Sequence, residues 1–178
     1  SFVIDDRGEI RVRYDKIHLF DVDLPSGESW RESSVYGPGE AVVAVDTPWA
    51  RIGLSICYDL RFPDLYRALS DAGANVLLVP AAFTVPTGEA HWHLLLRARA
   101  VEASAFVIAP AQAGQHADGR TTYGHSLVID PWGKVLLDMG DDPGLTCVEL
   151  DFAVMEDVRA RIPSLRHRRP LPENVSIA

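Results

Sequence analysis

A continuous apolar run at residues 75–80, Asn-Val-Leu-Leu-Val-Pro, constrains the fold more than any other feature of this chain. A run this short and uniformly apolar is typical of a strand that is buried on both faces. Pro63 and Asp64 before it suit the first turn of a helix, and Gly73 is placed to end that helix. The longest helix is predicted after it, at residues 88–104. Strands that alternate with helices in this way predict an α/β or α+β layered sandwich.

The rest of the chain extends this pattern without an internal repeat or a linker, so we expect one domain over residues 1–178. Further strands are expected at 2–4, 9–12, 41–45, 51–57, 105–110, 123–130, 135–137 and 145–151, with a last helix at 154–162. The predicted helix 88–104 is apolar almost all the way round. One sheet can cover only one side of it, so the other side requires a second helical layer or a second subunit. We therefore expect a homo-oligomer.

Composition and charge exclude several classes of protein. Hydrophobic residues make up 47% and charged residues 24%, the balance of a globular domain. A net charge of −8 argues against a nucleic-acid partner, although the end of the chain is locally basic. No apolar run reaches the ~20 residues that span a bilayer, so no membrane partner is expected.

Potential metal and cofactor sites are not indicated by the sequence. His91 and His93 are two apart, and on a helix they point in different directions, so they do not form a metal pair. No glycine-rich dinucleotide motif, phosphate-binding loop or HExxH motif is present. Cys57 and Cys147 are too few for a disulfide framework, which favours a cytoplasmic location. We expect no metal and no cofactor.

Cys57 is the sharpest candidate for chemistry, because it ends an apolar strand and a helix starts a few residues later. Backbone N–H groups and the positive end of a helix dipole would lower the pKa of a thiol at such a position and make it a better nucleophile. The alternative is a small buried hydrophobic residue. Cys147, inside the predicted strand 145–151, is interpreted as part of the core.

A nucleophilic thiol needs a base and a stabiliser for the oxyanion. His18 and His125 lie on strand-like segments and are interpreted as hydrogen-bonded structural histidines. Lys16 lies among apolar neighbours that would partly desolvate it, and its alternative is a solvated surface charge.

Three runs in order resemble the carbon–nitrogen hydrolase (nitrilase) superfamily: YDKIHLF at 14–20, GLSICYDLRFP at 53–63 and YGHSLVIDPWG at 123–133. Three further runs resemble its Nit branch of amidases: 80–84, 87–92 and 167–170. The resemblance covers essentially the whole chain. It implies a nitrilase-type α-β-β-α four-layer sandwich and a homodimer or larger assembly, in which the tail 163–178 packs on a partner subunit.

The resemblance also implies a Glu-Lys-Cys triad that hydrolyses the C–N bond of a small ω-amide through a thioester and releases ammonia. Cys57 would be the nucleophile, while Lys16 and the backbone N–H of Tyr58 would stabilise the oxyanion. Glu32 would orient the lysine and the substrate, its alternative being a solvated loop charge. Three residues that follow strand ends are expected to line the substrate pocket, where α/β sites form: Arg61, Phe83 and Thr84.

One departure from the family pattern concerns the general-base glutamate, which precedes the lysine motif in the family. Only Glu9 precedes Lys16 here, and it lies in a predicted turn, so it is not a credible base. The fold is thus expected to lack its N-terminal third, through a truncated or cleaved chain, a further N-terminal segment, or completion by another polypeptide. Alone, the chain is expected to be inactive. The alternatives are a carbamoyl-amide or nitrile hydrolase, or a non-catalytic binding protein that keeps the fold.

Overall fold

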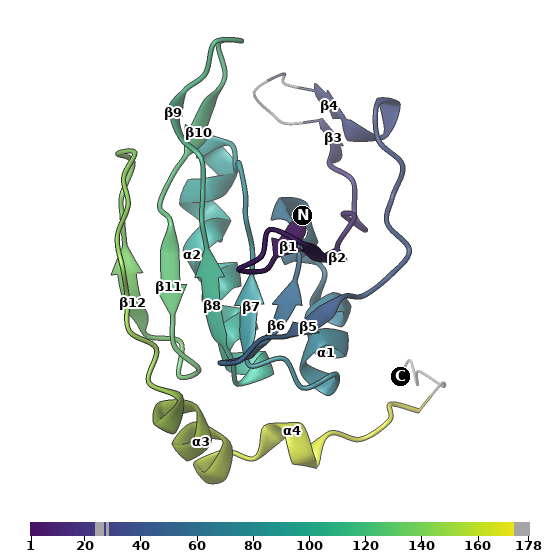
Figure 1. Cartoon of the computed structure of the whole chain (residues 1–178). Coiled ribbons are helices and arrows are strands. Elements are labelled where there is room, and N and C mark those ends of the chain that lie inside the picture. The colour runs from purple at the N-terminus through teal and green to yellow at the C-terminus, as the bar shows by residue number, and fades with distance from the viewer. Residues whose placement is uncertain (24–26, 28, 173–178) are drawn as a thin grey trace, which may run out of the picture.

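The computed structural model describes residues 1–23, 27 and 29–172 (Figure 1). The strands are β1 Phe2–Ile4, β2 Ile10–Arg13, β3 Asp21–Asp23, β4 Ser29–Arg31, β5 Ala44–Asp46, β6 Arg51–Leu54, β7 Val76–Leu78, β8 Phe106–Ala109, β9 Ala113–Gln115, β10 Thr121–Tyr123, β11 Leu127–Ile129 and β12 Val135–Asp138. The helices are α1 Pro63–Asp71, α2 Val85–Ala103, α3 Phe152–Arg161 and α4 Ser164–His167, with 3₁₀ turns at Glu32–Ser34 and Cys57–Arg61. None of these helices has the length and apolar character needed to cross a bilayer.

A six-stranded mixed sheet in the order β12-β11-β8-β7-β6-β5 forms the centre of the fold (Figure 1). Strands β6, β7 and β8 are parallel to one another, whereas β5, β11 and β12 run antiparallel to their neighbours. The predicted apolar strand at residues 75–80 is β7, in the interior of this sheet. The predicted hairpin is β5–β6. The α/β class is therefore confirmed.

The two faces of the sheet are covered differently, because side chains alternate along each strand. Leu77 and Val107 face the core that contains α1 and α2, while Val76 and Phe106 point to the other face and meet Met155 of α3. Helices α3 and α4 lie beyond the lower end of the sheet in Figure 1, where β7 and β8 begin. One large sheet and a helical layer on one of its faces are in place, as predicted for a nitrilase-type sandwich.

The two principal helices begin and end for local reasons. Pro63 occupies the first turn of α1, and Gly73, with a φ of 84°, follows its end as predicted. Helix α2 begins at Val85, three residues earlier than predicted, with a proline in its first turn. Its inner side is buried, but on its outer side Leu94 is 66% and Val101 49% exposed.

Three predictions about local structure are wrong. Residues 145–151 form no strand, and Cys147 is exposed rather than part of the core. An alternating apolar pattern gives a strand only where a neighbour supplies ladder hydrogen bonds, and this segment pairs with neither edge strand, β12 or β5. His18 and His125 also lie outside strands, and His125 has a left-handed φ of 55°.

Candidate active site

Cys57 is the first residue of the 3₁₀ turn Cys57–Arg61, which connects β6 to α1. Its φ is 49°, a conformation that a residue with a side chain adopts only when the surroundings hold it there. Its backbone N–H donates to the carbonyl of Pro80 at 2.9 Å, just after the end of β7. The main chain thus fixes the thiol at the carboxyl ends of two parallel strands.

A cavity of about 940 Å³ opens at this edge of the sheet. The segments that follow β6, β7 and β8 contribute to its walls, as expected for an α/β site. The structure brings all seven predicted site residues to this cavity: Lys16, Glu32, Cys57, Tyr58, Arg61, Phe83 and Thr84. Lining residues that the sequence did not single out include Trp30, Gln112 and Ser126.

Lys16 and Glu32 form an ion pair in the cavity wall. Their side chains are only 11% and 26% exposed, so this pair is less screened than a surface pair. The same Glu32 oxygen accepts the backbone N–H of Phe20 at 2.7 Å, which holds the carboxylate in place. Among the described residues that line the cavity, Glu32 is the one carboxylate. Glu9 is exposed on the β1–β2 hairpin.

Asp59 connects the lysine segment to the cysteine turn, a role that the motif sequence alone does not reveal. The side chain is fully buried, and one carboxylate oxygen accepts the Tyr14 hydroxyl at 2.7 Å and the Ile56 N–H at 2.9 Å. The other oxygen contacts His18 twice, at the backbone N–H (3.0 Å) and at ring Nδ1 (2.8 Å). Its position two residues after the cysteine, inside the recognised motif, was the available signal.

The electrostatics of the thiol differ from the sequence-based expectation. Burial raises the pKa of Cys57 overall, and the nearby Glu32 carboxylate acts in the same direction. The backbone N–H groups of Ala82 and Tyr58 and the charge of Lys16 oppose this effect. The predicted net lowering of the pKa is therefore wrong, because desolvation outweighs the donors. These groups nevertheless favour negative charge on the sulfur.

The two candidate histidines are each engaged by a carboxylate. His18 contacts buried Asp59 and stacks on Phe62, with ring centroids 3.6 Å apart. His125 contacts Asp138 through Nδ1 at 2.8 Å. Both therefore hold structural hydrogen bonds, as interpreted from the sequence, although not on strands.

The wall formed by Arg61, Phe83 and Thr84 combines a cation with an apolar surface. The Arg61 guanidinium lies 5.5 Å from the ring centroid of Phe83 and contacts His91 Nδ1 at 3.3 Å. Phe83 is 6% exposed and packs against buried Trp92. Two other cavity arginines pair with surface aspartates: Arg31 with Asp23 and Arg120 with Asp118.

The cavity brings together a thiol, a lysine and a glutamate, and comparison with known protein families agrees with this site. The carbon-nitrogen hydrolase family matches residues 1–160. The chain belongs to this family. It is 49% identical over 168 residues to a deaminated glutathione amidase of Synechocystis, covering 93% of this chain and 62% of that protein. A human deaminated glutathione amidase is 43% identical, and the chain spans 52% of its length.

Solved structures of carbon–nitrogen hydrolases share the fold. The Caenorhabditis elegans NitFhit protein superposes with a TM-score of 0.88 at 43% identity, over 94% of this chain and 41% of that one. A mutant amidase from Nesterenkonia sp. AN1 superposes with a TM-score of 0.72 at 30% identity, over 90% and 60% of the two chains. In that mutant, acrylamide added to the active-site cysteine. The present chain spans about 60% or less of these relatives.

Proposed function

We propose that this carbon–nitrogen hydrolase is an amidase in which Cys57 attacks the carbonyl carbon of a small ω-amide. The observation that carries the proposal is the convergence of Cys57, Lys16 and Glu32 at one cavity. A thiol, a cation and fixed N–H groups are the parts that acyl transfer requires. The names of the relatives support an amide as the substrate.

The proposed reaction has two stages. The thiolate electron pair adds to the amide carbon, and the carbonyl π pair moves to oxygen, where Lys16 and the Tyr58 N–H stabilise the negative charge. The C–N bond then breaks, the nitrogen takes a proton and leaves as ammonia, and Cys57 carries a thioester. Water adds to the thioester and the C–S bond breaks, giving a carboxylic acid and the free thiol.

Glu32 is proposed as a positioning residue that orients Lys16. Its carboxylate accepts from Lys16 and from the Phe20 N–H, which fixes its direction. Proton transfer between the thiol, the leaving nitrogen and the attacking water needs a group beyond this engaged pair. We therefore expect the 178-residue chain by itself to turn over slowly or not at all.

The position of Arg61 favours a substrate that carries a carboxylate at the end remote from the amide. Its guanidinium faces the cavity over aromatic rings and contacts a histidine, whereas Arg31 and Arg120 each pair with an aspartate. Arginine binds carboxylates through paired N–H donors. Phe83 and Thr84 would then pack along the chain that joins the carboxylate to the amide.

The test uses mass spectrometry, so that it does not depend on complete turnover. The chain is incubated with a panel of ω-amides, carbamoyl-amides and nitriles, quenched in acid and digested, and ammonia is measured in parallel. An acyl group on Cys57 and its absence in Cys57→Ala support the proposal. Ammonia release above the protein-free background that is equal in Cys57→Ala would overturn the proposal. The absence of any adduct, together with a Cys57 that iodoacetamide alkylates no faster than Cys147, would favour a non-catalytic binding protein.

The assembly and location remain proposals as well. We infer a homodimer that covers the outer side of α2, supported by the exposure of Leu94 and Val101. The tail 163–178 would contribute to this contact, although residues 173–178 lie outside the described part. Within the chain, Arg168 already pairs with Asp71 of α1. Two free cysteines suit the proposed cytoplasmic location.

A further inference from the structure

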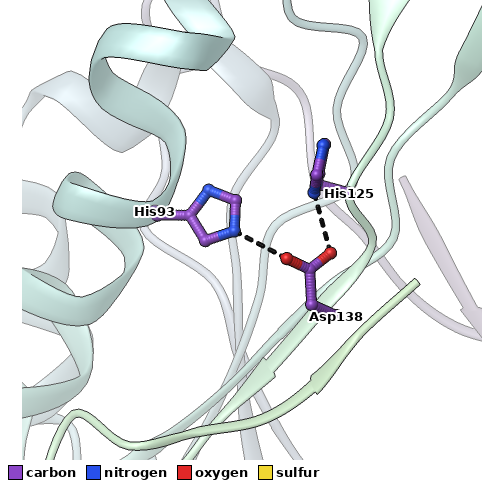
Figure 2. A group of neighbouring side chains, drawn as sticks. All are labelled: His93, His125 and Asp138. Carbon is purple, nitrogen blue, oxygen red and sulfur yellow. Dashed lines mark hydrogen bonds and ion pairs between the residues drawn. The ribbon is translucent and has the colours of Figure 1, made fainter. Parts of the chain in front are cut away.

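A second group of polar side chains lies away from Cys57, between α2 and the β11–β12 edge of the sheet (Figure 2). His93 projects from α2, His125 precedes β11, and Asp138 ends β12. Figure 2 shows the Asp138 carboxylate between the two imidazole rings. His93 Nε2 lies 2.9 Å from one carboxylate oxygen, and His125 Nδ1 lies 2.8 Å from the other.

These atoms form a recognisable ligand set. Imidazole nitrogen and carboxylate oxygen together suit divalent transition metals such as Zn²⁺. One ligand atom from each residue lies within 4.8 Å of the other two. Ligand atoms around a tetrahedral zinc ion are about 3.3–3.5 Å apart, from metal–ligand distances of about 2.0–2.1 Å. The His93–Asp138 and His125–Asp138 contacts would lengthen by about half an ångström to reach this spacing.

The His125 ring is held in place before any ion binds. It stacks on Tyr123 with centroids 4.3 Å apart and an interplanar angle of 23°. Its backbone carbonyl accepts the Trp92 indole N–H at 2.7 Å, and its φ of 55° shows that the turn is held in an uncommon conformation. The His93 ring lies edge-on to the same tyrosine. Ligands fixed by their neighbours lose little entropy on binding.

Access and charge also suit a cation. The side chains of His93 and Asp138 are each 34% exposed and that of His125 is 26% exposed, so water can complete the coordination. Glu89, one turn before His93 on α2, adds negative charge to this region. His91 does not belong to this cluster, because it contacts Arg61 at the Cys57 cavity.

We propose that His93, His125 and Asp138 bind a divalent transition metal ion of the zinc class, with water in the remaining positions. The ion would connect α2 to β11 and β12, through ligands that are 32 and 45 residues away from His93 in sequence. It would also fix the residue next to Ser126, which lines the Cys57 cavity. The proposal does not depend on the proposed amidase activity.

The test is zinc binding to the chelator-treated chain by isothermal titration calorimetry, with folding checked by circular dichroism. We expect one saturable site and a thermal midpoint that rises with zinc. Asp138→Asn keeps the shape of the side chain and one acceptor oxygen, but it turns the other oxygen into an amide donor and loses the anionic ligand. His93→Ala loses a nitrogen ligand. Each should weaken zinc binding by at least about 10-fold. His91→Ala, on the same helix, is the matched control and should bind zinc like the unchanged chain.

Cobalt distinguishes this site from the thiols. With Co²⁺ in place of zinc, ligation by nitrogen and oxygen gives visible bands without a thiolate charge-transfer band, and Asp138→Asn should abolish them. A thiolate band that persists in Asp138→Asn would assign the metal to a cysteine and overturn the proposal. It would equally fail if no saturable binding occurred, or if His93→Ala and Asp138→Asn bound zinc as tightly as His91→Ala. The three side chains would then form a hydrogen-bonded cluster only.

Discussion

The Tyr14 hydroxyl offers the sharpest test of how the cysteine turn is held. Tyr14→Phe removes one of the donors to the fully buried Asp59 carboxylate, while the ring continues to fill its space. Asp59 keeps the Ile56 N–H and the two contacts from His18. A hydrogen bond to a charged group is worth about 1.5–3 kcal/mol, and the retained ring adds little cavity cost. We expect the free energy of unfolding to fall by about 1.5–3 kcal/mol.

Urea unfolding at neutral pH measures this change. We expect the slope of the free energy of unfolding against urea concentration to be the same in both proteins. Tyr36→Phe is the matched control, because Tyr36 is 63% exposed and its variant should stay within about 0.5 kcal/mol of the unchanged chain. A Tyr14→Phe variant that was also within about 0.5 kcal/mol would refute the view that Asp59 depends on this donor.

Three further predictions concern pH, assembly and substrate. Burial raises the pKa values of Tyr14 and Tyr66, and the Asp59 carboxylate also raises that of Tyr14. The stability that these neutral phenols contribute should therefore be fully present below pH ~10 and be lost above it, less steeply in Tyr14→Phe. Equal pH dependence of the free energy of unfolding in the two proteins, measured with urea, would contradict this. If the proposed homodimer forms through α2, Leu94→Glu should convert it to monomer in light scattering, whereas Val154→Glu on α3 should not; a Leu94→Glu chain with an unchanged mass would contradict this. Arg61→Gln should raise the concentration of a carboxylate-bearing ω-amide that half-saturates acylation of Cys57 about 10–100-fold, and that of a neutral amide much less. An equal effect on both would refute the carboxylate role.

The parts of the fold that sequence could predict depend on local signals. The apolar run that became β7 needs burial on both faces wherever it lies, and Pro63 and Gly73 bound α1 through their own backbone preferences. Residues 145–151 show the limit of such signals. Their alternating pattern suits a strand, but pairing depends on a neighbour that local sequence does not specify.

The candidate site divides in the same way. Family motifs identified Cys57 and Lys16, and the structure places both at one cavity. The pKa of the thiol was misjudged because the extent of burial around Cys57 is a property of the folded core, not of the turn. Asp59 was missed because its four contacts come from Tyr14, His18 and Ile56, and two of these lie more than forty residues away.

The central claim is that Cys57 is a nucleophile activated by Lys16, and the rate of its modification by acrylamide tests this most directly. The experiment uses the Cys147→Ser chain, because Cys147 is exposed and would react independently. Peptide mapping should place the adduct on Cys57, and Lys16→Met should slow its formation at least about 10-fold, since the cation favours the thiolate. Equal rates with and without Lys16, or a Cys57 that remains unmodified, would contradict the account.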